Sequence, residues 1–526
     1  MNLHSVALIL AFLTGYLSLS LEMIWIRVVD FTRHGQPETF GYVLSAYLIG
    51  IALGAVIGGR LSLKKNSNAF KLTAYLLIIA AFLTYFSIPV VAEVITVSYP
   101  VGLALCFLFI SLVACAFGVI FPLLCHATIE PGEAVGRKMS YIYLANIFGA
   151  TISPLLTGLY LFDHFSLSTI VMAIAVLSVM VAVVLYAGSS SSSRQKLIFL
   201  LATLALSVVA FQTSTPFYQD IYAKLQYKTS WAQKGPFKYV VENRNGLITV
   251  EATKYGGDSI YGGGVWDSRF NIDPVFDLNG ISRAYFVAAL HRKPLEVLEI
   301  GLSSASWALV LDAYEPVESL DVVEINHGYP EIIGHYSPQS RLFESEKVSL
   351  HFDDGRRWLN RNPERKFDLI LMNTSFHGRG NITNLLSKEF LNIMKSHLKP
   401  GGVVYYNTTH SEDVIFTAAQ VYKYIFLYDG FIAVSDAPFD MSEQEVWINM
   451  QKFTKHPIAA MYQSRSHLAV FRRLAAKKLI DIADDYRSRS DLISISDDNM
   501  ATEFRRVSPR GGVSWADFLK SVWQTG

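Results

Sequence analysis

The sequence is short of cysteine and of charge, and each shortage excludes a class of protein. Its 526 residues include three cysteines and 17% charged residues, and the net charge is +1. A net charge so close to zero gives no indication of a nucleic-acid partner. The cysteines all lie in one apolar segment without metal-ligand spacing, at Cys106, Cys115 and Cys125. They predict buried packing and no metal site.

A cleaved signal peptide is not expected either, because the first apolar run is long, lacks a basic n-region and is followed by further runs. Hydrophobic residues are abundant instead, at 51% of the chain, and they are concentrated at the front. The sequence is too apolar for a wholly soluble protein and too long for one ordinary domain. We therefore expect a membrane half followed by a soluble half.

Seven apolar runs predict a transmembrane domain over residues 1–213, each near the roughly 20 residues that a bilayer requires. They lie near 5–26, 40–62, 71–96, 99–125, 140–162, 167–187 and 196–213, the last being the shortest.

Glu22 lies in the last turns of the first run and has two interpretations. An ionisable group inside a membrane is costly and by default functional. The interpretation we favour places Glu22 at the interface beside Trp25 and Arg27, in an aromatic belt with a local ion pair. Asn146 in the fifth run is a candidate hydrogen-bond partner for its carboxyl group.

A linker and a small β-subdomain are expected over residues 214–290, ahead of an α/β domain over 291–526. Residues 238–250 predict a hairpin around Asn245-Gly246, and residues 261–271 predict a strand pair with a glycine-rich turn. A helix is expected at about 281–290.

The stretch 295–326 (LEVLEIGLSSASWALVLDAYEPVESLDVVEIN) predicts a strand, a turn at Gly301, a helix over 303–311 and a second strand carrying Glu324. An acidic residue about 20 residues beyond the turn of a βαβ unit can bind a ribose. Serines replace the further glycines of a dinucleotide-binding turn, so a purely structural βαβ unit remains the alternative.

Further strands are expected at 348–352, 367–372 and 403–406. Gly301, Glu324, Asp354 and Asn373 then lie at or beside the carboxyl ends of four successive strands. Ligands of doubly wound sheets bind at that edge. The convergence predicts a ligand site there.

The soluble half resembles the spermidine synthase (polyamine aminopropyltransferase) family in six motifs: VLEIG, VVEIN, DDGRRWL, DLILMNTS, LLSKEF and LKPGGV. The front half, including LEMIWIR, resembles the membrane domain fused to some bacterial members. The resemblance implies a multi-span α-helical membrane domain followed by an α/β Rossmann-like, methyltransferase-type domain with a small N-terminal β-subdomain.

The resemblance also implies a binding site. Gly301 and Ser303 would line the methionine-derived part of the donor, and Glu324 would bind the ribose hydroxyls. Asp354, in the adenine-side loop with Asp353 and Gly355, would approach the adenine amino group. The co-substrate would be S-adenosylmethionine or its decarboxylated form, without a metal. Its sulfonium activates the attached carbon, so the protein need mainly position a nucleophile.

Two features depart from the family. Asn373 stands where the family has the aspartate that helps to deprotonate the attacking amine, and a neutral amide cannot be that base. The Tyr-His-Glu acceptor segment is absent. His377 is a candidate replacement base. Arg379 could bind a carboxylate, which would favour S-adenosylmethionine; either residue could instead be a solvent-facing loop residue.

The sequence therefore predicts an enzyme that releases methylthioadenosine, by aminopropyl transfer to an amine such as a polyamine or by intramolecular cyclisation or elimination. The alternatives are a methyltransferase and a non-catalytic nucleoside-binding sensor or transport-coupled protein. The family resemblance suggests a homodimer.

The expected location is a bacterial inner membrane, with the soluble half in the cytoplasm where nucleosides are. The loop charges argue otherwise. Basic residues gather in the loops on the N-terminal side of the seven spans, and the positive-inside rule would place that side in the cytoplasm and the soluble half outside. These are Arg60, Lys64, Lys65, Lys71, Arg137, Lys138, Arg194 and Lys196. The span count, the charge rule or the nucleoside hypothesis must therefore be wrong.

Overall fold

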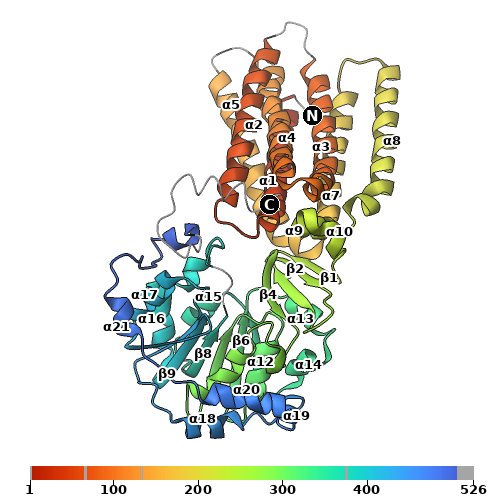
Figure 1. The fold of residues 1–526 in the computed structure, drawn as a ribbon. Coiled ribbons are helices and arrows are strands. Elements are labelled where there is room, and N and C mark those ends of the chain that lie inside the picture. The colour runs from red at the N-terminus through yellow and green to blue at the C-terminus, as the bar shows by residue number, and fades with distance from the viewer. Residues whose placement is uncertain (1–2, 64–67, 131, 133, 374–376, 506–526) are drawn as a thin grey trace.

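The computed structural model describes residues 3–505 apart from 64–67, 131, 133 and 374–376. Within that part, seven helices are long and apolar enough to cross a membrane, and they form one bundle (Figure 1). The helices are α1 (Leu3–Thr32), α2 (Thr39–Ser62), α3 (Ala69–Val97), α4 (Tyr99–Thr128), α5 (Val135–Ser153), α7 (Leu167–Ala187) and α8 (Ser193–Tyr218). The fifth continues through a π-helical stretch, Pro154–Leu161, into α6 (Phe162–His164). The expected multi-span helical part is confirmed.

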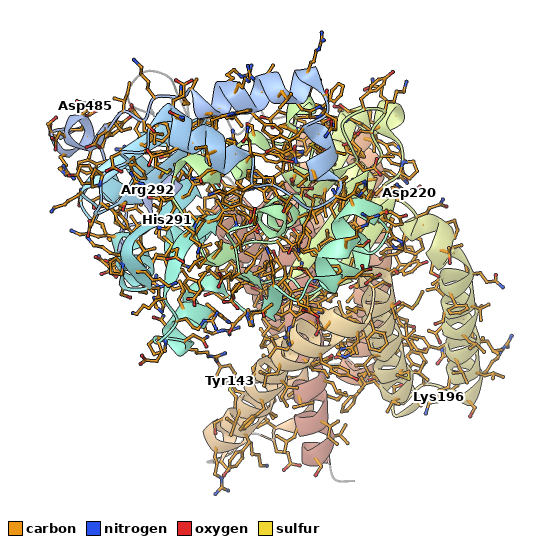
Figure 2. All side chains as sticks on the ribbon, turned by 90° about the horizontal axis from the view of Figure 1, so that it is seen from below. Tyr143, Lys196, Asp220, His291, Arg292 and Asp485 are labelled. Atoms are coloured by element: carbon orange, nitrogen blue, oxygen red, sulfur yellow. The ribbon has the colours of Figure 1, made fainter. Side chains whose placement is uncertain are left out.

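Small residues set how closely these helices pack. At Gly54 on α2, an added Cβ would lie 2.2 Å from the carbonyl oxygen of Cys115 on α4, so only glycine allows this approach. α8 contacts its neighbours least, and its apolar side chains, such as Leu201 and Phe211, are exposed. Figure 2, in which Lys196 marks this helix, shows it standing apart from the others. An apolar, outward-facing helix suits a lipid environment.

A small antiparallel sheet follows the bundle, with strand order β1-β2-β3-β4. Its strands are β1 (Tyr239–Asn243), β2 (Gly246–Glu251), β3 (Ser259–Gly262) and β4 (Val265–Arg269), after the short helices α9 (Ile221–Tyr227) and α10 (Trp231–Lys234). The first hairpin turns at Arg244–Asn245, one residue earlier than expected, because Gly246 already pairs with Asn243.

The second sheet has strand order β10-β11-β9-β8-β5-β6-β7. Its strands are β5 (Glu296–Ile300), β6 (Ser319–Glu324), β7 (Val348–Phe352), β8 (Phe367–Met372), β9 (Leu398–Asn407), β10 (Tyr424–Tyr428) and β11 (Phe431–Ser435). The five strands from β5 to β9 are parallel, and β10 and β11 add an antiparallel edge. Chain order reverses between β5 and β8, which is the point where such sheets bind ligands. The expected Rossmann-like domain is confirmed.

Helices cover both faces of this sheet (Figure 1). They are α11 (Ser282–Tyr285), α12 (Ser306–Ala313), α13 (Tyr329–Ile333), α14 (Ser337–Ser340), α15 (Gly355–Arg361), α16 (Lys388–Ser396), α17 (Glu412–Ala419), α18 (Glu443–Met450), α19 (Ile458–Met461), α20 (Arg465–Ala475) and α21 (Ala483–Arg487). Val297 packs into the core on one face and Leu298 into the core on the other. Burial on both faces explains why β8 (FDLILM) is a nearly continuous apolar run.

Two expected helices are shorter than predicted. The one at about 281–290 is α11 followed by a 3₁₀ turn over Phe286–Ala289. The one after Gly301 begins at Ser306 rather than Ser303. The chain first passes through left-handed conformations at Ser303 (φ 48°) and Ala305 (φ 60°), which take the place of the missing glycines.

The C-terminal end of α1 touches the soluble half directly. The Arg27 guanidinium donates to the carbonyl oxygen of Asn243 on β1 at 2.8 Å. His34 Nδ1 lies 2.8 Å from the carbonyl oxygen of Gly264, in the turn between β3 and β4. The two halves of the chain are therefore in contact through the connection between α1 and α2.

Candidate functional site

A cavity of about 300 Å³ opens at the carboxyl ends of β5, β6 and β8. Its volume is at the lower end of the roughly 300–1,000 Å³ typical of small-molecule sites. The sequence-predicted residues in its wall are Gly301, Ser303, Glu324, Asp353, Asp354, Gly355, Asn373 and Arg379. The structure therefore brings together eight of the nine candidate site residues; only His377 lies elsewhere.

Glu324 ends β6 and is the best-positioned of these groups. It is 5% exposed. The backbone N–H of Leu302 donates to one carboxylate oxygen and that of Asn326 to the other, both at 2.8 Å. Burial raises the pKa of Glu324 to about 7, although these hydrogen bonds oppose the shift. The carboxylate is fixed in orientation and has lone pairs left for a pair of hydroxyls.

Gly301 supplies the sharp turn beside it. Its φ of +98° lies in the region that favours glycine. Its N–H donates to the carbonyl oxygen of Val323 at 2.9 Å, which holds the turn against β6. Ser303, two residues on, faces the same cavity.

The loop after β7 contributes two carboxylates that differ in the ion pairs and hydrogen bonds they already make. Asp353 forms ion pairs with Arg357 and with Arg361, the latter at 3.1 Å. Burial alone would raise the pKa of Asp353, but these arginines outweigh it and the pKa is lowered. Asp354 caps α15 by accepting the N–H of Arg357 at 2.8 Å. Asp354 is the freer of the two to meet a ligand.

Gly355 lets α15 approach β5. A Cβ there would lie 2.7 Å from a methyl carbon of Ile300. Glycine at this position keeps the loop after β7 against the end of β5, and so closes this side of the cavity.

Asn373 follows β8 and faces the cavity. Its amide oxygen accepts a long hydrogen bond of 3.4 Å from the Asn407 side chain. A neutral amide so placed can orient a ligand but cannot take up a proton at neutral pH. Thr374, Ser375 and Phe376 of the same loop lie outside the described residues.

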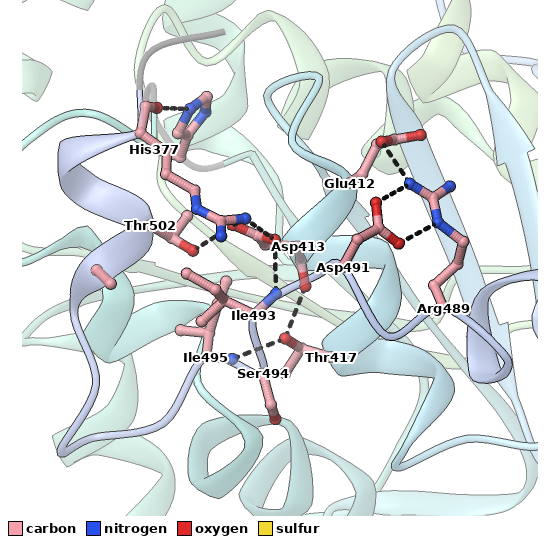
Figure 3. A network of polar contacts seen from close by, with 12 residues as sticks. His377, Glu412, Asp413, Thr417, Arg489, Asp491, Ile493, Ser494, Ile495 and Thr502 are labelled. Atoms are coloured by element: carbon pink, nitrogen blue, oxygen red, sulfur yellow. Dashed lines mark hydrogen bonds and ion pairs between the residues drawn. The ribbon is translucent and has the colours of Figure 1, made fainter. Parts of the chain in front are cut away.

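His377 lies outside the cavity wall. It is 2% exposed, and Thr409 Oγ1 lies 2.6 Å from its Nδ1. The carbonyl oxygen of Arg505 lies 3.0 Å from its Nε2, and Figure 3 shows His377 beside the network around Asp413 and Thr502. Burial lowers the pKa of His377. Asp413 holds the same C-terminal segment by accepting from Thr502 and Arg505. His377 is thus an anchor for residues 502–505, neither solvent-facing nor placed to act on a ligand in the cavity.

Arg379 has the opposite character. Its side chain packs against Gly35 and Gly263, where added Cβ atoms would lie 3.0 Å and 2.8 Å from it. Its guanidinium lines the cavity and makes no hydrogen bond or ion pair with the described residues. A positioned guanidinium with unclaimed donors is suited to a carboxylate.

Asp267 on β4 and Tyr329 on α13 are among the wall residues that sequence reasoning missed. The Tyr329 hydroxyl donates to Asp267 Oδ2 at 2.6 Å. Burial raises the pKa of Asp267, partly opposed by Tyr329, Ser303 and Arg379. The alternation with exposed Trp266 could have indicated that Asp267 faces inward. No sequence signal pointed to Tyr329.

Within the described part of the chain, no group of three or more His, Cys, Asp or Glu side chains is arranged to hold a metal ion. The donors and acceptors of the cavity include the Glu324 carboxylate, the two carboxylates of the loop after β7, the Asp267–Tyr329 pair, the Asn373 amide and the Arg379 guanidinium. Such a set can bind a polyfunctional organic molecule with hydroxyl, amino and carboxylate groups.

Residues 284–428 match the family described as the spermine/spermidine synthase domain. A polyamine aminopropyltransferase of Agathobacter rectalis is 32% identical over 119 residues, which are 22% of this chain and 41% of that protein. A spermine synthase of Arabidopsis thaliana is 28% identical over 138 residues, 25% of this chain and 38% of that protein. The chain thus spans less than half the length of these curated relatives. The expected resemblance is confirmed for this region.

Two solved structures align with part of the chain. A spermidine synthase from Thermotoga maritima does so with a TM-score of 0.35 and 17% identity, over 45% of this chain and 84% of that one. Human methyltransferase-like protein 13 in complex with SAH gives a TM-score of 0.28 and 17% identity, over 38% and 91%. Both leave more than half of this chain unmatched.

Proposed function

We propose that the C-terminal half binds S-adenosylmethionine and transfers the propyl chain that its sulfonium activates to an amine, releasing methylthioadenosine. The curated relatives are named polyamine aminopropyltransferases or spermine synthase, which supports a propyl transfer. The single observation that carries the proposal is Glu324, a buried carboxylate fixed by two backbone N–H groups in the wall of a ligand-sized cavity. Its unused lone pairs fit the two hydroxyls of a ribose.

The intact donor is favoured over the decarboxylated one because of Arg379. The Arg379 guanidinium faces the same cavity as Glu324 and has no hydrogen bond or ion pair with the described residues, so it would pair with the carboxylate of the methionine portion. The decarboxylated donor has no group for it. The transferred chain would then keep its carboxylate.

The step itself needs little covalent help from the protein. The lone pair of the amine attacks the carbon beside the sulfonium, the carbon–sulfur bond breaks, and its electron pair leaves on sulfur as a neutral thioether. The proton of the new ammonium must go to a base. Asp267 is the base we assign, because its raised pKa suits a proton acceptor and Asn373 is neutral.

To test this proposal, the purified full-length protein is incubated with S-adenosylmethionine or its decarboxylated form, with and without putrescine. The thioether product is then identified by mass spectrometry. We expect amine-dependent methylthioadenosine, faster from the intact donor. Methylthioadenosine without an amine would point to cyclisation or elimination. S-Adenosylhomocysteine would point to methyl transfer, and binding without turnover to a sensor.

Paired variants assign the product to the cavity. Glu324→Ala should abolish donor binding, whereas Glu331→Ala, an exposed glutamate seven residues along the chain, should not change it. Equal donor binding by both variants would show that the nucleoside does not bind in this cavity.

A further inference from the structure

A second cavity lies inside the helical bundle, between α1, α2, α4 and α5, and it holds about 430 Å³. It is larger than the cavity at the sheet and has no residue in common with it. Leu48 on α2 and Tyr143 on α5 line it and are 55% and 57% exposed. Figure 2 shows Tyr143 at the rim of the bundle. The cavity therefore opens sideways, between α2 and α5.

Glu22 faces this cavity, and its carboxyl group is unpaired. It is 7% exposed, and it has no hydrogen bond or ion pair with any described residue. Arg27, the expected ion-pair partner, donates to the soluble half instead. Asn146, the expected hydrogen-bond partner, lines the same cavity but donates to the carbonyl oxygen of Ala11 at 3.0 Å.

The position of Glu22 also differs from the expected interface. α1 extends to Thr32, ten residues beyond Glu22. Ten residues are about 15 Å of helix at about 1.5 Å per residue. An unpaired acidic group at that depth is expensive, and such groups commonly mark a functional site.

Apart from Tyr143, which is exposed, the other polar side chains of the wall have hydrogen-bond partners among the described residues. Thr14 donates to the carbonyl oxygen of Ala11 at 3.1 Å, and the hydroxyls of Ser18 and Tyr47 bond to each other. Glu22 is therefore the buried polar group of this wall that needs an external partner. A cation would supply it.

Four aromatic rings also line the wall, among aliphatic side chains such as Leu19 and Ile51. Phe117 and Phe121 come from α4, Tyr47 from α2 and Tyr143 from α5. The rings of Phe121 and Tyr143 face each other edge to face, with centroids 6.1 Å apart. Aromatic faces around a carboxylate attract an ammonium group that carries an apolar body.

We propose that this cavity binds an organic cation, an ammonium with an apolar body, with Glu22 as its counter-ion. The proposal does not depend on the function of the soluble half. The ammonium could belong to a soluble amine or to the headgroup of a lipid that reaches the lateral opening, and the two sources share this chemistry.

The test uses the full-length protein in nanodiscs of phosphatidylglycerol, a lipid without an amine, with radiolabelled benzyltrimethylammonium as the probe. We expect saturable binding that excess neopentylbenzene, the uncharged isostere, fails to displace. No saturable binding, or equal displacement by neopentylbenzene, would overturn the proposal. In phosphatidylethanolamine nanodiscs, weaker probe binding would identify the headgroup as the occupant, and unchanged binding a soluble amine.

Three variants locate the probe. Glu22→Gln should weaken binding at least tenfold, and Glu93→Gln, a more exposed glutamate of the same bundle, should not. Ala55→Phe keeps the charge but fills the cavity from an exposed position, and should also abolish binding. Unchanged affinity in Glu22→Gln would overturn the proposal, and so would unchanged affinity in Ala55→Phe if Glu22→Gln does not fold.

Discussion

The backbone N–H of Gly380 donates to the carbonyl oxygen of Gly35 at 2.7 Å. This bond joins the loop after β8, which carries Arg379, to the connection between α1 and α2. Gly35 has a φ of +69°, and an added Cβ would lie 3.0 Å from Arg379 Cγ. The helical bundle therefore forms part of the support of the candidate carboxylate receptor.

Gly35→Ala tests this support. A left-handed conformation costs a non-glycine residue about 1–2 kcal/mol, and the new methyl group would displace Arg379. We expect lower thermal stability and several-fold weaker binding of S-adenosylmethionine by calorimetry. Gly59→Ala, at a glycine with open space around it, is the matched control. Similar affinities in the two variants would mean that Gly35 does not position Arg379.

Arg379→Gln should weaken S-adenosylmethionine binding without affecting methylthioadenosine, which lacks the carboxylate. A hydrogen bond to a charged group contributes about 1.5–3 kcal/mol, so the expected loss is roughly tenfold to a hundredfold. Arg473→Gln, at an exposed arginine far along the chain, serves as the control. An equal loss for both ligands would show that Arg379 supports the fold of the cavity rather than the carboxylate.

The affinity for the nucleoside should rise with pH. The pKa of Glu324 is about 7 because of burial, and protonation removes acceptor lone pairs that a ribose needs. The ionised fraction, and with it the affinity for methylthioadenosine, should increase about tenfold between about pH 6 and pH 8. Glu324→Gln should bind weakly and without this pH dependence. A flat profile in the unmodified protein would contradict the ribose role.

Asp267→Asn should reduce turnover while leaving donor binding nearly intact. General base catalysis contributes about 10²–10⁴-fold, and the amide cannot take the proton. Asp258→Asn, directly before β3 of the same small sheet and ion-paired with Lys238, is the control for stability. Unchanged turnover in Asp267→Asn would exclude this residue as the base. Tyr329→Phe should shift the pH–rate profile, since its hydroxyl contacts the Asp267 carboxylate.

The sidedness of the bundle can be measured with single cysteines in a background where Cys106, Cys115 and Cys125 are alanine. Gln195 lies in the first turn of α8, and Figure 1 shows that α8 begins at the end of the bundle away from the soluble half. Lys254 is an exposed residue in the loop between β2 and β3. We expect an impermeant maleimide to label Gln195→Cys, but not Lys254→Cys, in intact spheroplasts. The reverse pattern would obey the loop charges and contradict a cytosolic nucleoside as the ligand.

The parts of the site that sequence could predict are those tied to strand ends. Glu324 and Asn373 follow apolar runs whose burial on both faces is a local property of the sequence. Because the carboxyl ends of parallel strands lie at one edge of the sheet, the convergence of Glu324 and Asn373 could be predicted without knowing any tertiary contact. The left-handed turn at Ser303 and Ala305 could not be predicted, since it depends on packing that compensates for two strained conformations.

The remaining residues depend on contacts between distant segments. Asp267 comes from the small sheet and Tyr329 from a helix of the large one, and neither position has a motif. The observed position of His377 differs from the expected one for a similar reason. A histidine in a polar loop was expected to face solvent or a ligand, but residues 502–505 cover it. The unpaired state of Glu22 likewise follows from what Arg27 and Asn146 bind instead.

The contacts between the C-terminal end of α1 and the soluble half also constrain the order in which the protein can assemble during synthesis. α1 is translated first, yet Arg27, His34 and Gly35 bond to partners 216, 230 and 345 residues later. At roughly 5–20 residues per second, the last partner is made about 17 to 70 s after the first helix. During that interval the polar C-terminal end of α1 lacks its hydrogen-bond partners from the soluble half. The ligand cavity is consequently among the last features to be completed, and a prematurely terminated chain would display an uncovered helix end to the quality-control proteases of the cell.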